Sequence, residues 1–113
     1  MIYHLANEND WLVANFCDEP YMGGTQDIID GYIHLSTREQ IMESAARHRT
    51  GEHGLLMLAV EKMEIFGALR WEVSRKGALF PHCYGPLPFA AVVWTAPLSV
   101  GPDNRHIFPR MSE

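Results

Sequence analysis

One run of residues restricts the possible folds of this chain more than any other, namely Leu55-Leu56-Met57-Leu58-Ala59-Val60. Consecutive apolar residues after two glycines, Gly51 and Gly54, are typical of a short strand that is buried on both faces. Periodicity alone does not distinguish such a strand from a buried helical segment, so the helical alternative stays open. A strand of this kind lies at the centre of a sheet, and we expect the other elements to surround it.

Four further segments have the pattern or composition of strands. Residues 2–5 and 31–35 each place a histidine among apolar residues, and residues 69–73 alternate apolar and charged side chains. Residues 90–98 are rich in valine and tryptophan, which favour strands. With the apolar run, these segments predict about five strands in a mixed or antiparallel sheet.

Two helices are expected between the strands. The first follows the N-cap candidates that begin at Asn7 and ends before Pro20, because the residue before a proline avoids the helical region. The second follows Ser36, which has the spacing of a capping box with Glu39. Two segments rich in glycine or proline are expected to be loops: 21–30 and 80–88. The predicted class is therefore α+β.

Length and composition indicate a single compact domain. The chain has 113 residues, 47% of them hydrophobic, which fits one core over residues 1–98 followed by a C-terminal tail at 99–113. No signal peptide and no apolar stretch of roughly 20 residues is evident, so we expect a cytoplasmic protein that does not span a membrane. Cys17 and Cys83 form no C-x-x-C pair and are expected to be ordinary thiols.

The charge of the chain limits its partners. Nine basic and fourteen acidic residues give a net charge of −5, which opposes nonspecific binding to a nucleic-acid polymer. A small nucleotide could still bind a local basic pocket. The oligomeric state is left open by the sequence.

Two histidines and one glutamate are the main candidates for chemistry. His4 and His34 stand in similar frames, Tyr3-His4-Leu5 and Ile33-His34-Leu35, and a polar helix start follows each. If the two strands are neighbours, both imidazoles can point into one groove with Glu72. Such a group suits ribose hydroxyls or a metal ion.

Each of these residues also has a purely structural interpretation. A strand histidine is often half-buried and hydrogen-bonded to backbone, and Glu72 beside Arg70 can be an ordinary ion pair on one face of a strand. His82 can tether a turn, and Tyr84 can be a packing aromatic.

Four blocks of the sequence resemble a known bacterial family called domain of unknown function 952. The blocks are Ile2-Tyr3-His4-Leu5-Ala6, Gly31-Tyr32-Ile33-His34-Leu35-Ser36-Thr37, Leu69-Arg70-Trp71-Glu72, and Leu79-Phe80-Pro81-His82 followed after one residue by Tyr84-Gly85-Pro86-Leu87-Pro88. The resemblance covers residues 2 to about 98. Family members usually have Glu-Pro-Ser-Arg where this chain has Glu72-Val73-Ser74-Arg75, a departure that should alter the turn but not the charge.

The resemblance implies a fold and a set of site residues. The family has been likened to the ADP-ribosyltransferase fold, in which a first-strand His or Arg, a second-strand aromatic or His, and a late Glu surround the nicotinamide ribose of NAD. His4, His34 and Glu72 occur in that order and would be the catalytic residues. The implied substrate-binding residues are Arg70, Arg75, His82, Tyr84 and Ser36. NAD is then a candidate substrate, without a metal ion or a bound cofactor.

The leading functional hypothesis is therefore a transferase or glycohydrolase that acts on NAD, ADP-ribose or a related nucleotide. A noncatalytic module that binds a nucleotide or a peptide in the same groove is the first alternative. A metal-dependent enzyme with His4, His34 and Glu72 as ligands is the second.

Overall fold

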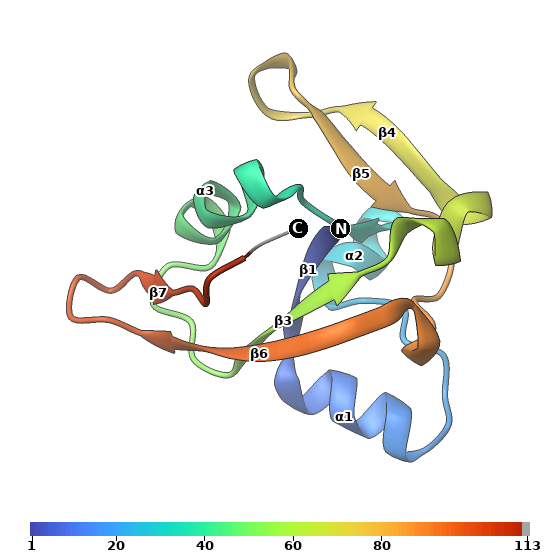
Figure 1. The fold of residues 1–113 in the computed structure, drawn as a ribbon, viewed down its shortest axis with the longest axis horizontal. Coiled ribbons are helices and arrows are strands. Elements are labelled where there is room, and N and C mark those ends of the chain that lie inside the picture. The colour runs from blue at the N-terminus through green and yellow to red at the C-terminus, as the bar shows by residue number, and fades with distance from the viewer. Residues whose placement is uncertain (112–113) are drawn as a thin grey trace.

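Strands and helices are interspersed along the described part of the chain (Figure 1). The structure is a computed structural model that describes residues 1–111, apart from the side chain of Arg75. The strands within this range are β1 (Ile2–Asn7), β2 (Ile33–His34), β3 (Leu55–Val60), β4 (Leu69–Val73), β5 (Leu79–Cys83), β6 (Val92–Val100) and β7 (His106–Ile107). The helices are α1 (Glu8–Phe16), α2 (Thr25–Asp30) and α3 (Arg38–His48), with 3-10 helices η1 (Lys62–Ala68), η2 (Arg75–Gly77) and η3 (Phe89–Ala91). The α+β class is thus confirmed.

The strands form two antiparallel sheets rather than the single sheet that we expected. One has the order β1-β3-β6-β7 and the other the order β2-β5-β4. The apolar run is strand β3, and it pairs with β1 on one side and β6 on the other. The prediction of a central strand here is confirmed.

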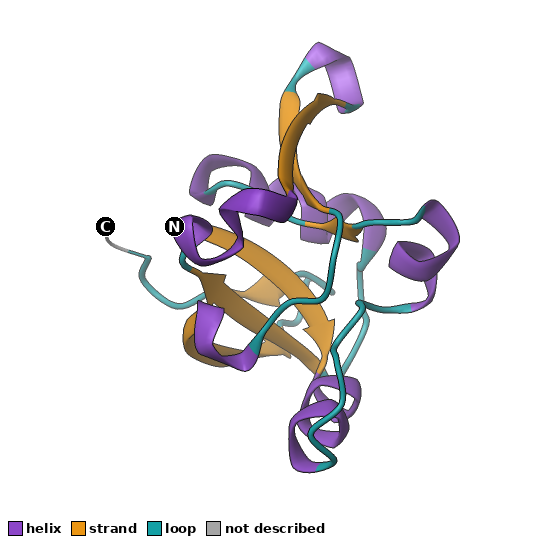
Figure 2. Cartoon of the chain, turned by 90° about the vertical axis from the view of Figure 1, so that its right-hand side faces the viewer, coloured by secondary structure: helices purple, strands orange, loops and turns teal. Residues whose placement is uncertain are grey.

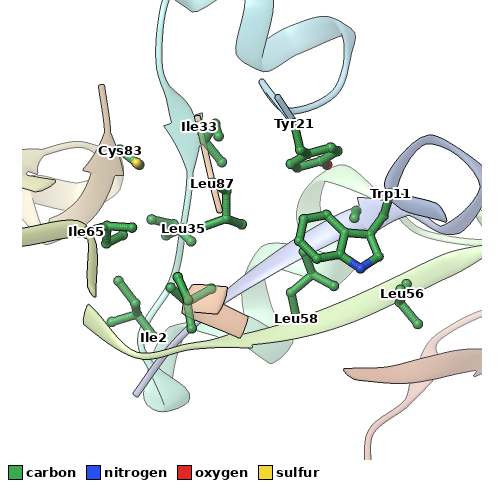
Figure 3. Close-up of a cluster of buried hydrophobic side chains, with 13 residues drawn as sticks. Ile2, Trp11, Tyr21, Ile33, Leu35, Leu56, Leu58, Ile65, Cys83 and Leu87 are labelled. Carbon is green, nitrogen blue, oxygen red and sulfur yellow. The ribbon is translucent and has the colours of Figure 1, made fainter. Parts of the chain in front are cut away.

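The core lies on both faces of β3. Leu56 and Leu58 face a cluster that includes Trp11 of α1 and Ile33 of β2 (Figure 3). The alternate residues of the same strand face a second cluster with Ile41 of α3. Because both faces are covered, every residue of β3 is buried, which explains its uninterrupted apolar sequence.

A backbone bridge connects the two sheets. Tyr3 of β1 and Ser36 exchange two N–H···O=C hydrogen bonds of 2.8 Å. The two histidine-bearing segments are therefore neighbours. This bridge also explains why the capping box of α3 lies one residue later than predicted. The Ser36 N–H is already bonded to Tyr3, and the Thr37 N–H instead donates to Gln40 Oε1 at 3.0 Å.

The prediction of a loop at 21–30 is wrong for its second half, where the residues form α2. Asp27 Oδ2 accepts a 2.7 Å hydrogen bond from the Gly24 N–H and so satisfies a free donor at the helix start. The helix ends at Gly31, whose φ of +87° is a left-handed conformation that favours glycine.

The expected loop at 80–88 is also wrong at its start, because residues 80–83 belong to β5. Pro81 lies within this strand opposite Trp71. Its ring removes an N–H, but its carbonyl accepts a 3.1 Å hydrogen bond from the Leu35 N–H. The missing donor is tolerated because β2 pairs with only His82 and Cys83 of β5.

The segment after residue 98 is partly paired with the first sheet. Strand β6 continues to Val100, and β7 pairs with its last two residues. His106 of β7 is buried, with Nε2 2.7 Å from the carbonyl oxygen of Glu52. Among the described residues, no helix is long and apolar enough to cross a membrane.

Candidate functional site

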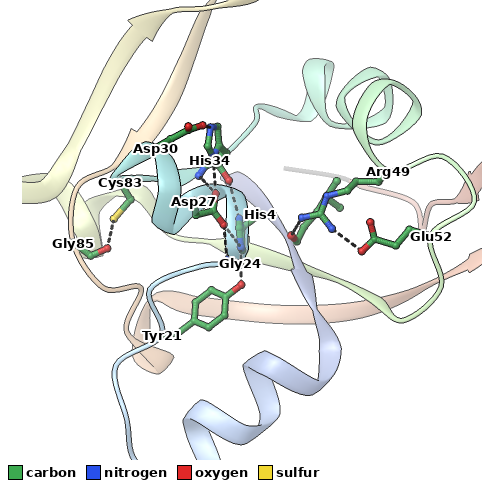
Figure 4. A network of polar contacts seen from close by, with 11 residues as sticks. His4, Tyr21, Gly24, Asp27, Asp30, His34, Arg49, Glu52, Cys83 and Gly85 are labelled. Atoms are coloured by element: carbon green, nitrogen blue, oxygen red, sulfur yellow. Dashed lines mark hydrogen bonds and ion pairs between the residues drawn. The ribbon is translucent and has the colours of Figure 1, made fainter.

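The site begins with a buried histidine between the two sheets. His4 Nδ1 lies 2.7 Å from the carbonyl oxygen of His34, and Nε2 lies 2.8 Å from the Tyr21 hydroxyl (Figure 4). His4 is only 2% exposed, and burial lowers its pKa. The neutral ring therefore donates through Nδ1–H to the carbonyl and accepts the Tyr21 proton at Nε2.

Asp27 of α2 holds the next histidine in place. Its Oδ1 accepts hydrogen bonds from the His34 backbone N–H at 2.9 Å and from His34 Nδ1 at 2.5 Å. Burial acts to raise the pKa of Asp27, but the bonds from His34 and the nearby His4 outweigh it and leave the pKa lowered. Asp27 is therefore a buried, ionised carboxylate.

His34 is held between two carboxylates. Besides the Nδ1 bond to Asp27, its Nε2 lies 3.0 Å from Asp30 Oδ2. The hydrogen bond to Asp27 raises the pKa of His34, more than burial lowers it. Both ring nitrogens lie within hydrogen-bonding distance of carboxylates, which favours the imidazolium form of His34 at the edge of the site.

The outer part of the site is centred on Glu72 of β4. Its Oε1 accepts a 2.7 Å hydrogen bond from the Tyr84 hydroxyl and another of 2.7 Å from His82 Nδ1. Both hydrogen bonds lower the pKa of Glu72, and the bond from Tyr84 has the larger effect. Glu72 is thus an oriented carboxylate, and its side chain is 39% exposed.

Aromatic rings connect the two parts. Tyr32 stacks on His82 with ring centroids 4.0 Å apart, and lies 4.6 Å from His34 and 5.2 Å from Tyr84. The guanidinium carbon of Arg70 is 5.3 Å from the centre of the Tyr84 ring. Together these rings form a surface that has Arg70 and Glu72 at one end and His34, with Asp27 and Asp30, at the other.

Strand register explains why these side chains share one face. His82 of β5 lies opposite His34 of β2 on one side and Arg70 of β4 on the other. Directly opposed residues in antiparallel strands project to the same face, and Glu72 follows Arg70 by two positions. We call this surface, made by Tyr32, His34, Arg70, Glu72, His82 and Tyr84, the β5 face.

Most of the residues predicted from the sequence meet at the β5 face: His34, Glu72, Arg70, His82 and Tyr84. His4 lies behind it and reaches it through the His34 carbonyl. Ser36 does not join it, because its hydroxyl lies 3.1 Å from that of Ser44 on α3. The side chain of Arg75 lies outside the part of the chain that the structure describes.

Four residues of the site are not among those that the sequence predicts: Tyr21, Asp27, Asp30 and Tyr32. Three of them fall in the segment that we expected to be a loop. The one local signal was the pair Gly24 and Asp27, whose three-residue spacing is that of a helix start with a capping acid.

Within residues 1–111, no group of three His, Cys, Asp or Glu side chains is placed to hold a metal ion. The potential ligand nitrogens of His4 and His34 are already bonded to protein groups. The expectation that the protein works without a metal stays a prediction.

A separate apolar hollow lies beside α1. Leu12, Val13, Phe16 and Phe89 line it, with Asn15, Cys17 and Asp18. It contains none of the histidines or tyrosines of the β5 face, and its single carboxylate has no imidazole partner among its lining residues. We therefore place the candidate site at the β5 face.

Comparison with known proteins gives matches over most of the chain. Residues 5–95 match the model of a family described as a protein of unknown function, DUF952. The chain belongs to this family. No match was found among curated proteins.

Solved structures of a similar protein have this fold. The chain is 38% identical to protein CC0527 from Caulobacter crescentus; the match to its crystal structure has a TM-score of 0.88 and covers 94% of this chain and 92% of that one. The match to its solution NMR structure has a TM-score of 0.79 and covers 92% and 89%. The likeness to ADP-ribosyltransferases has no counterpart in these comparisons and stays a prediction.

Proposed function

We propose that the β5 face binds NAD, ADP-ribose or a related nucleotide, with Glu72 at the ribose. The observation that carries this proposal is the bonding of Glu72. Both His82 and Tyr84 bond the same oxygen, Oε1, so these two bonds leave Oε2 to accept a ligand. A carboxylate fixed in this way suits a pair of sugar hydroxyls, which donate to it without the cost of first ordering the side chain.

The surroundings of Glu72 fit the other parts of a nucleotide. Tyr32 and Tyr84 offer ring faces on which a base can stack. Arg70 is exposed beside Tyr84 and can meet a phosphate through its planar guanidinium. This local cation matters because the chain as a whole carries a net charge of −5.

The same arrangement supports chemistry at the ribose. When a base leaves the sugar, positive charge develops at the ring, and the anionic Glu72 would stabilise it. His82 and Tyr84 would keep the carboxylate in place. His4 is buried, so in this scheme it positions His34 and does not touch the ligand.

One observation favours binding without turnover as the second candidate function. His34 is bonded to carboxylates at both ring nitrogens, and His82 is bonded to Glu72 and buried. Neither imidazole is then placed to exchange a proton with a ligand. Under this alternative the β5 face recognises a nucleotide and releases it unchanged.

Thermal unfolding with NAD, ADP-ribose and AMP tests binding. A ligand at about 100 times its dissociation constant adds roughly 2.7 kcal/mol of stability, which raises the melting temperature of a domain this size by several degrees. If all three leave the melting temperature unchanged at millimolar concentration, the nucleotide proposal is wrong.

Glu72→Gln separates the two candidate functions. For an enzyme, this variant should lose release of nicotinamide or ADP-ribose, measured by chromatography, while the ligand-induced melting shift largely persists. Glu64→Gln on η1 changes the same side chain at an exposed position and should behave as wild type. A protein with no measurable turnover but a clear melting shift is a binding module.

A further inference from the structure

The outer edge of β4 is open. Within the described residues, β4 is the last strand of its sheet and pairs with β5 alone. The β4–β5 hairpin stands away from the rest of the molecule in both views, with no other element beside the outer edge of β4 (Figures 1 and 2). An edge strand of this kind offers backbone donors and acceptors to another chain.

Alternation along β4 identifies the outward backbone groups. Tyr84 N–H bonds Ala68 O at 2.7 Å, and Ser74 N–H bonds Ala78 O at 2.8 Å. Even-numbered residues of this stretch therefore direct their backbone groups toward β5. Trp71 and Val73 direct theirs outward, and so does Leu69, whose N–H is used by Phe66 O at the end of η1.

The sequence of β4 is complementary to itself in one register. When a second copy runs antiparallel about a twofold axis at Trp71, Leu69 lies opposite Val73 and Arg70 lies opposite Glu72. Trp71 then faces its own symmetry mate as a hydrogen-bonded pair, and the Val73 N–H can donate to the Leu69 carbonyl of the other copy, because only the N–H of Leu69 is already used. Opposite charges meet twice, and a shift of register by two residues would instead place like charges opposite each other.

The apolar side of the hairpin gives a reason for this pairing. Trp71 is 42% exposed, Val73 69% and Leu79 52%, all on the face opposite Arg70 and Glu72. A second copy at the β4 edge would place Trp71 beside its own symmetry mate and Leu69 beside Val73. Exposed apolar side chains along an open strand are thus covered by the same contact that satisfies its backbone.

We propose that two copies of this chain pair through β4 in this register, to form one continuous six-stranded sheet in the order β2-β5-β4-β4-β5-β2. The partner copy then contributes to the candidate site, because its Arg70 lies opposite Glu72. This inference does not rest on the proposed function, since it follows from the edge, the charges and the apolar face alone.

A second copy fits the edge better than an unrelated extended peptide. A peptide would need its own basic and acidic residues at the matching spacing, whereas this chain supplies both in Arg70 and Glu72. Isologous pairing about a twofold axis is also the commonest way in which soluble chains associate.

Mass measurement by light scattering or sedimentation, over a range of concentrations of the full chain, gives the test. Wild type should approach twice the 12.8 kDa chain mass. Arg70→Glu places like charges opposite each other and should raise the dissociation constant roughly tenfold or more. The double variant Arg70→Glu with Glu72→Arg restores opposite charges in this register and should regain most of the affinity.

A matched pair of proline variants tests the edge itself. Val73→Pro removes an outward N–H and should give a monomer, while the bonds of β4 to β5 use its neighbours. Leu79→Pro makes the same change at the cross-strand partner on β5, whose backbone faces away from β4, and should leave the dimer intact. Circular dichroism confirms that each variant is folded.

Three results would overturn the proposal. A wild-type chain that stays monomeric up to about 1 mM excludes a dimer of useful affinity. A dimer that survives both Arg70→Glu and Val73→Pro uses another surface. A double charge variant that stays as weak as Arg70→Glu, although folded, excludes this register.

Discussion

Asp27 joins two histidines that belong to different sheets. It bonds His34 of β2 directly, and its Oδ2 lies 3.9 Å from Nε2 of His4 in β1. The carboxylate is buried and ionised, so its charge is balanced by the imidazolium of His34. At the scale of single residues, this small set of charges keeps α2 against the sheets.

The charge state of His34 predicts a pH-dependent stability. Its pKa is raised in the folded protein, so its contribution is fully present below the ordinary value of 6.5 and is lost as the pH rises through the folded pKa. Thermal unfolding should show the largest gap between wild type and His34→Gln near pH 5.5, and a smaller gap near pH 9.

His4 has the opposite pH dependence. Its pKa is lowered chiefly by burial, which both proteins share, so its own contribution falls in both as the pH drops below 6.5. A gap that is constant with pH, or wider at pH 9, would show that His34 is not a stabilising imidazolium.

Removal of the buried hydroxyl of Tyr21 should lower the stability of the folded protein. Tyr21→Phe leaves Nε2 of His4 without its 2.8 Å donor in a buried position. We expect a loss of about 1–3 kcal/mol in the free energy of unfolding, measured with denaturant. Tyr84→Phe removes a hydroxyl from a much more exposed side chain and should cost less, and equal losses would contradict this account.

The residues of the site differ in how far the sequence predicts them. His34, Glu72 and His82 occupy regular strand positions, so alternation is enough to place them on one face. Asp27 could not be predicted, because its role depends on a contact with His34 seven residues away that forms only when α2 packs against β2.

At the scale of elements, α2 depends on the turn before it. Gly23 has a φ of +94°, and a Cβ there would lie 2.5 Å from the Cβ of Asp27. Gly24 has a φ of −86°, and its added Cβ would approach no closer than 3.8 Å to Asp27. The two neighbouring glycines therefore face very different constraints.

Alanine substitution distinguishes the two glycines. Gly23→Ala should lower the free energy of unfolding by about 1–3 kcal/mol through backbone strain and displacement of Asp27. Gly24→Ala should cost less, on the order of 0.5–1 kcal/mol, because Gly24 is the N-cap of α2 and glycine is favoured over alanine there. Chemical denaturation measures both, and a Gly23→Ala loss as small as that of Gly24→Ala would mean that the turn is not required to place Asp27.

The elements that the sequence predicts correctly are those whose own residues carry a clear pattern. The buried run of β3, the alternation of β4 and the Asn7 N-cap of α1 each correspond to an observed element. The strand β5 was missed because Pro81 is typical of loops, and it is tolerated only because β2 is so short. The extra helix α2 was missed because its segment has few apolar positions and two glycines.

At the scale of the whole molecule, the two sheets differ in their structural roles. The first, with β3 at its centre, supplies the core on both of its faces. The second exposes the β5 face on one side and an open edge at β4. The division into two sheets depends on pairing between distant segments, such as Tyr3 with Ser36, which no local pattern reveals.

An NMR titration of the ¹⁵N-labelled protein with ADP-ribose tests the proposal that the β5 face binds a nucleotide. We expect saturable shift changes in Tyr32–His34, 70–73 and 80–84. Shift changes confined to the hollow at Leu12, Phe16 and Phe89, or none at millimolar ADP-ribose, would contradict the claim.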